Sequence, residues 1–128
     1  MRWLLCICLL LIVVPAFAGQ SSYARPSATA TGGDAKQLAK LQKERLGAKA
    51  VYLKKPKDSA LRHRYVVATV KLGTATMMCE SLDRKVKYRD ALRLYREALK
   101  LEPDNREAAN NRDLIEGIYR SMGRPIPK

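Results

Sequence analysis

The sequence predicts an all-α fold of about four helices, arranged as short antiparallel helical hairpins. Apolar residues recur at steps of three and four over several segments, which is the spacing of one face of a helix. No stretch alternates apolar and polar residues for long, and no turn dipeptide typical of β-hairpins lies between two such stretches. Prolines and capping residues separate the segments by only a few residues, so consecutive helices are expected to pack side by side.

The first helix is expected from about Ala35 to Leu53, a segment rich in the strong helix formers Ala, Lys, Gln, Leu and Glu. Asp34 is placed to cap its N-terminus. Pro56 ends it, because the residue before a proline disfavours the helical region. Arg45 interrupts the side that carries its apolar residues, which are Leu38, Leu41, Ala48 and Tyr52.

The second helix is expected from Asp58 and Ser59, either of which can cap it, to about Glu80. Two adjoining apolar stripes run along this helix. The first consists of Leu61, Tyr65, Ala68, Leu72, Ala75 and Cys79. The second consists of Val66, Val70, Gly73 and Met77. A helix that is apolar over so much of its circumference packs on more than one side. Gly73 has no Cβ, so a neighbouring segment can come close there.

The third helix is expected from about Tyr88 to Glu102, after a polar and basic connection over residues 81–87. Its apolar side consists of Ala91, Leu92, Tyr95, Ala98 and Leu99, and its other side carries Arg89, Arg93, Arg96 and Lys100. Pro103 ends this helix.

The fourth helix is expected to begin at Asp104 and Asn105. Asp104 and Glu107 have the spacing of a capping box, although Asp replaces the usual Ser or Thr. Its apolar side consists of Ala108, Ile115, Tyr119 and Met122. Gly123 is placed to end it in the left-handed conformation, and residues 124–128 are expected to form an extended tail.

The N-terminus has the order of a secretory signal peptide. A positive start at Arg2 precedes the uncharged apolar run Leu4–Val14, and the small residues Ala16 and Ala18 flank Phe17 before the expected cleavage site. The run is too short for a comfortable membrane span, although an uncleaved anchor is the alternative. The expected organisation is a signal peptide at 1–18, a flexible tether at 19–34, a helical domain at 35–123 and a tail at 124–128.

Cleavage after Ala18 would leave an exported chain, periplasmic or extracellular, of 110 residues from the original 128. The leader carries a single charge, so the net charge falls only from +13 to +12. Cys79 would be the only cysteine left, so no intramolecular disulfide can form. Its place in the apolar stripe favours burial over a cross-link between two chains.

The sequence argues against an enzyme. His63 is the only histidine and lies between Arg62 and Arg64, so no histidine cluster for a metal can form. Cys79 lies 16 residues further along the same expected helix, about 24 Å along its axis. Gly32 and Gly33 lack the strand and the Lys-Ser or Lys-Thr of a phosphate-binding loop. No cofactor and no metal site is expected.

The third helix carries a recognisable pattern. Ala91, Tyr95, Ala98 and Pro103 fall in the order A-x3-Y-x2-A-x4-P, which resembles the second helix and closing proline of a tetratricopeptide repeat. Leu72-Gly73 resembles part of the first helix of such a repeat, and the REAANN segment after Asn105 resembles the start of the next one. Pro56 and Pro103 are 47 residues apart, compared with about 34 in a typical repeat, so the likeness is to a degenerate and minimal member.

The resemblance implies a non-catalytic module that binds a protein or peptide in a groove lined by first helices. The residues that would line this groove are Val67, Val70, Thr74, Met77, Met78, Asn110 and Asn111. Side-chain amides can hydrogen-bond a peptide backbone, and methionines adapt to varied apolar partners. The alternative for Val70 and Met77 is simple core packing. Only one repeat is clear, so a partner or a second copy of the chain could complete its edges.

An alternative function follows from the positive charge. Basic residues cluster around the start of the third helix, namely Arg84, Lys85, Lys87, Arg89, Arg93, Arg96 and Lys100. Such a cluster attracts polyanions, and export favours anionic envelope polymers or lipid headgroups over nucleic acid. The alternative is a solvated face on which Asp90 and Glu97 pair with neighbouring cations.

Overall fold

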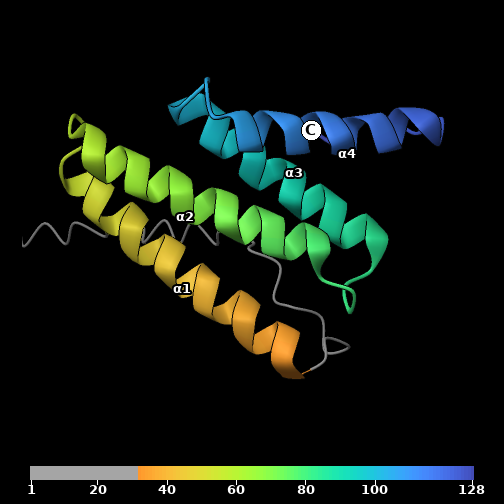
Figure 1. The fold of residues 1–128 in the computed structure, drawn as a ribbon, viewed down its shortest axis with the longest axis horizontal. Helices are drawn as coiled ribbons and strands as arrows, with labels where there is room; N and C mark the ends of the chain where they lie inside the picture. Colours follow the sequence, from red (N-terminus) through yellow and green to blue (C-terminus); the bar gives the residue numbers. More distant parts are fainter. Residues whose placement is uncertain (1–31) are drawn as a thin grey trace, which may run out of the picture.

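The computed structural model describes residues 32–128, and the expected signal peptide and most of the expected tether lie outside this range. Within it the chain forms four helices and no strand: α1 (Gly32–Lys54), α2 (Ser59–Met78), α3 (Arg84–Leu101) and α4 (Arg106–Ser121). Consecutive helices run antiparallel and each packs on the one before it, while α2 also touches α4 (Figure 1). The predicted all-α fold is confirmed. None of these helices is long and apolar enough to cross a membrane.

The start of α2 is the one expected from the sequence. Asp58 is its N-cap, and the carboxylate accepts hydrogen bonds from the backbone N–H groups of Ala60 and Leu61 at 3.0 and 3.1 Å. These bonds satisfy two of the donors that every helix leaves free at its first turn.

The start of α1 differs from the prediction. The helix begins at Gly32, so the last three residues of the expected tether are helical, and Asp34 lies in the first turn instead of capping it. The Asp34 carboxylate accepts a hydrogen bond from the Ser81 hydroxyl at 2.7 Å, in the connection between α2 and α3. This tertiary contact, which local sequence does not reveal, gives the carboxylate its partner.

The starts of α3 and α4 also differ. Asp83 caps α3 and accepts from the backbone N–H of Lys85 at 2.8 Å, so the helix begins four residues before Tyr88 and absorbs half of the expected basic connection. In α4 the cap is Asn105, which accepts from the backbone N–H of Ala108 at 3.0 Å. The capping box of Asp104 and Glu107 was therefore a wrong prediction: an amide one residue later provides the cap.

The C-terminal end of the fold is partly as expected. Gly123 follows α4 with a φ of 63°, the left-handed conformation predicted for it. Residues 124–128 are not helical, but they are not a free tail. Ile126 packs against the main core cluster, and the Arg96 guanidinium donates a hydrogen bond to the Pro127 carbonyl.

The main core joins α2, α3 and α4 and is built around Tyr95, whose side chain is fully buried. Its buried members are Val66, Val70, Ala91, Leu92, Tyr95, Ala98, Ala108, Ile115 and Tyr119. A Cβ placed on Gly73 would lie 3.0 Å from Cε1 of the Tyr95 ring. The close approach expected at Gly73 is thus made by an aromatic side chain, which occupies the space that glycine leaves.

A smaller core cluster attaches α1 to α2 and α3. It consists of Leu38, Leu72, Cys79, Leu82 and Leu94. Cys79 is 6% exposed, so its expected burial is confirmed.

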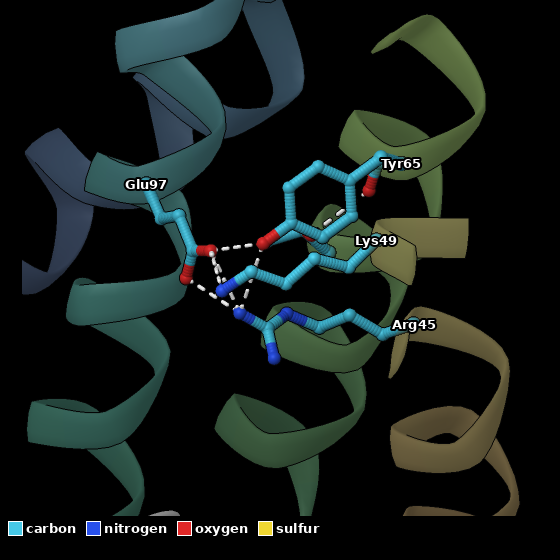
Figure 2. A network of polar contacts seen from close by, with 5 residues as sticks. Arg45, Lys49, Tyr65 and Glu97 are labelled. Carbon is cyan, nitrogen blue, oxygen red and sulfur yellow. Dashed lines mark hydrogen bonds and ion pairs between the residues drawn. The ribbon is translucent and has the colours of Figure 1, made fainter. Parts of the chain in front are cut away.

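A buried polar network makes the second attachment of α1 (Figure 2). Arg45 is fully buried, and its guanidinium lies 2.6 Å from the Glu97 carboxylate on α3. The Tyr65 hydroxyl donates to the same carboxylate and accepts from Arg45 at 3.2 Å. Lys49 approaches Glu97 to 3.9 Å, and the Tyr52 ring stacks on Tyr65 at 5.7 Å between centroids.

This network corrects two predictions. Arg45 does not interrupt the buried side of α1, because it occupies that side together with Leu38 and Ala48. Glu97 does not pair with its sequence neighbours, because its carboxylate binds cations from another helix. The ion pair between the buried Arg45 guanidinium and the half-buried Glu97 carboxylate fixes the position of α1, and loss of Glu97 takes this carboxylate away from a buried positive charge.

We predict that Gly73→Ala destabilises the protein by about 1–2 kcal/mol, because the added methyl group meets a buried ring that has little room to move. The same substitution at Gly117, in α4, is the matched control, since no atom lies within 4 Å of a Cβ there. Gly117→Ala should stabilise by up to about 1 kcal/mol through helix propensity. Urea unfolding followed by circular dichroism measures both, and equal stability of the two variants would contradict the packing described.

We predict that Glu97→Leu costs about 3–5 kcal/mol of stability, because it leaves the Arg45 charge buried without this carboxylate. The double variant Arg45→Leu with Glu97→Leu should lose less than the sum of the two single variants, by a coupling of about 1–3 kcal/mol. Arg89→Leu, which breaks the exposed pair with Asp90, is the control and should cost at most about 1 kcal/mol. Strictly additive losses in denaturant unfolding would show that Arg45 and Glu97 do not depend on each other.

Candidate functional site

The binding groove predicted from the sequence lies on the surface where α2 meets α4. Both helices pack on α3 and touch each other. On α2, Val67, Thr74 and Met78 share one side by their helical spacing, and on α4 the same is true of Asn111 and Leu114. We call the side chains on these two sides the α2–α4 surface.

A chain of hydrogen bonds through the Tyr95 hydroxyl connects α2 and α4 at this surface. The Asn111 amide donates to that hydroxyl at 3.1 Å, and the hydroxyl lies 3.1 Å from the Thr74 hydroxyl. Thr74 in turn donates to a Glu107 carboxylate oxygen at 3.0 Å. Because the single proton of Thr74 goes to Glu107, the Tyr95 hydroxyl is the donor to Thr74. One core residue of α3 thereby orients polar groups on both α2 and α4.

The predicted groove residues divide into two groups in the structure. Thr74 and Asn111 are brought together by Tyr95, while Met78 and Asn110 are exposed and Val67 is half-buried. Val70 is 4% exposed within the main core, and Met77 packs against it. These last two side chains contribute to the core, which was the alternative considered for them.

Three further residues of this surface escaped prediction. The Tyr95 hydroxyl was expected only to be part of a packing side chain, and Glu107 was expected to cap α4. Leu114 is 55% exposed, and its spacing from Glu107 and Asn111 by seven and three residues was the available signal.

Burial raises the pKa of the Tyr95 phenol above its usual value of 10.0. The hydrogen bonds with Thr74 and Asn111 act in the opposite direction, and the negative charge of Glu107 adds to the increase. The phenol is therefore neutral at physiological pH and serves as a hydrogen-bonding group.

Several cations of the predicted basic cluster already have partners within the protein. Arg89 pairs with Asp90 at 3.2 Å, and Arg96 pairs with Glu116 at 2.9 Å. The Lys87 ammonium donates to the Cys79 carbonyl at 3.2 Å and lies over the Tyr88 ring. Arg84, Lys85, Arg93 and Lys100 are exposed. The expected pairing of Asp90 with a neighbouring cation is confirmed.

The described residues contain no group of three or more His, Cys, Asp and Glu side chains arranged to hold a metal ion. His63 is largely exposed, with Nδ1 at 3.1 Å from the Glu102 carboxylate. The Cys79 thiol is at the other end of α2, 3.8 Å from the Asp34 carboxylate and 3.4 Å from the Ser81 hydroxyl.

Comparison with known proteins finds no match among protein-family models, curated proteins or solved structures.

We predict that the free energy of unfolding falls above about pH 10, in part because of Tyr95. Unfolded tyrosines ionise near pH 10, whereas the folded phenol keeps its proton to higher pH. Its contribution is complete below the unfolded pKa and is lost as pH rises through the raised folded pKa. Tyr95→Phe should flatten this decline and remove an ionisation above pH 10 from the absorbance titration at 295 nm, at a cost of about 1 kcal/mol at neutral pH. If Tyr95→Phe instead removed an ionisation at or below pH 10, the raised pKa of Tyr95 would be contradicted.

Proposed function

We propose that the chain is an exported, non-catalytic protein–protein interaction module of the tetratricopeptide type, which binds a protein or peptide on the α2–α4 surface. The observation that carries the proposal is the Tyr95 side chain, which packs on Gly73 and orients Thr74 and Asn111 through its hydroxyl. Export rests on the signal-peptide pattern of residues 1–18.

The packing of α2 and α3 supports the tetratricopeptide part of the proposal. Ala91 and Ala98 are fully buried on the side of α3 that carries Tyr95, and Pro103 follows the end of that helix at Leu101. The resemblance rests on these positions, and the burial of the two alanines supports it. In this proposal α2 and α3 form the one clear repeat, and α4 is the first helix of an incomplete second repeat.

The chemistry of the α2–α4 surface supports a peptide or protein as partner. Met78 and Leu114 are 68% and 55% exposed, so each offers an apolar anchor at the surface. The exposed Asn110 amide can donate to and accept from a peptide backbone. Thr74 and Asn111 are already oriented by Tyr95, which lowers the entropy cost of binding.

A second candidate function is binding of anionic envelope polymers or lipid headgroups, favoured by the net charge of +13. Ion pairs at Arg89 and Arg96 reduce the number of cations available to a long polyanion. The two functions differ in salt dependence, since polyanion binding collapses between low and moderate salt whereas apolar docking persists.

We predict that linear peptides selected against the immobilised full chain, from a random display library at moderate salt, bind through Met78 and Leu114. Met78→Glu and Leu114→Glu should each weaken binding by about tenfold or more, because they place a charge at an apolar anchor. Both side chains are exposed, so the substitutions should leave the fold intact, which circular dichroism checks. Fluorescence polarisation of a labelled peptide measures the affinities.

The matched controls are Leu53→Glu and Leu46→Glu on α1, where the side chains are 61% and 44% exposed. These variants carry the same change in charge at apolar residues outside the α2–α4 surface, and should bind as the unmodified chain does. Equal losses in all four variants, or a library that yields no binder, would count against the proposed function.

A further inference from the structure

A cleft of about 620 Å³ opens between the first turn of α3 and the last turn of α4. It is separate from the α2–α4 surface, because α3, α4 and the segment after α4 line it and α2 does not. Its volume lies within the range of small-molecule sites, about 300–1,000 Å³.

Three cations line the cleft: Arg84 and Lys85 at the start of α3, and Arg124 just after α4. None of them makes an ion pair within residues 32–128. The carboxylate of Asp83, which also lines the cleft, already accepts a hydrogen bond as the cap of α3. The cleft therefore has an excess of positive charge.

The position of these cations is electrostatically unfavourable in the free protein. Arg84 and Lys85 lie at the positive end of the α3 dipole, where the N-cap carboxylate of Asp83 is the one negative charge against the three cations that line the cleft. Gly123 turns the chain in the left-handed conformation, and the Arg124 N–H donates to the Tyr119 carbonyl at 3.0 Å, which fixes the backbone from which a third cation lines the cleft. An anion placed among them would relieve this repulsion.

The remaining wall of the cleft is apolar and aromatic. Tyr88 contributes from α3, and Ile118, Tyr119 and Met122 contribute from the end of α4. Met122 is 50% exposed although it is a large hydrophobic residue. An apolar body placed here would remove this surface from water.

We propose that this cleft binds an amphipathic anion, in which a carboxylate or phosphate headgroup contacts Arg84, Lys85 and Arg124 and an alkyl chain lies against Tyr88 and Met122. Because cations and an apolar wall line the same cleft, a ligand that fits it has both an anionic headgroup and an alkyl chain. The headgroup chemistry is shared by fatty carboxylates and single-chain phosphate lipids. The site is independent of the proposed peptide-binding function.

The test is calorimetric titration of the full chain with decanoate and decyl phosphate, each below its micelle concentration. At least one of them should bind at this cleft, and the tighter of the two identifies the headgroup. Inorganic phosphate, which lacks the chain, and decyltrimethylammonium, which reverses the charge, should bind at least about tenfold more weakly. Equal binding of all four probes would overturn the proposal.

Two triple variants locate the binding. Arg84→Ala with Lys85→Ala and Arg124→Ala should weaken decanoate or decyl phosphate by about tenfold or more, because charge-assisted contacts are lost. Lys36→Ala with Lys40→Ala and Lys43→Ala removes the same charge from exposed positions on α1 and should leave binding unchanged. An equal loss of affinity in both triple variants would show a general effect of net charge and would overturn the proposed binding site.

Amide NMR of the same full chain provides a second readout. Probe binding should shift the signals of residues at the start of α3 and the end of α4 and leave those of α1 in place. Shifts at the cleft that depend on protein concentration with no probe present would instead identify a second copy of the chain as the occupant, and would overturn the proposal.

Discussion

The packing of Tyr95 against Gly73 is the constraint on which the rest of the structure depends. The ring is fully buried, and it occupies space that any other residue at position 73 would fill with a Cβ. Interiors pack at nearly crystalline density, so the separation of α2 and α3 is set by this pair. The hydroxyl of the same buried side chain hydrogen-bonds with the half-buried Thr74 and Asn111 and positions both. Core packing and surface geometry are thus linked through one residue.

The attachment of α1 follows a different physical principle. Its apolar contact with α2 and α3 is the smaller core cluster. The Arg45–Glu97 ion pair, together with the Tyr65 hydroxyl, adds a specific polar contact that fixes where α1 lies (Figure 2). Such a network adds little net stability compared with apolar residues, but it penalises other positions of the helix, which would leave the charges without their partners.

Both proposed binding regions include residues of α4, which packs on α3 and touches α2. One side of α4 is buried on α3 through Ala108 and Ile115, and among the helices of residues 32–128 only α2 and α3 contact it (Figure 1). Near its start, amides and an exposed leucine form the α2–α4 surface. Near its end, where α4 diverges from α3, tyrosines and Met122 form the wall of the basic cleft. The regions differ in charge, so they suit ligands of different chemistry.

The sequence by itself determined the elements: four helices, most of their apolar sides, the Asp58 cap, the left-handed Gly123 and the burial of Cys79. These features depend on residues close together in the chain, where spacing and capping chemistry act locally. It also proposed Thr74 and Asn111 for one surface, but gave no sign of the Tyr95 hydroxyl that hydrogen-bonds with both. Only the tertiary structure decided the partners of charged groups, because helical spacing does not specify which carboxylate faces a given cation. Arg45 looked like an interruption and is buried against Glu97 from another helix, and Arg124 looked like part of a tail and lines the basic cleft.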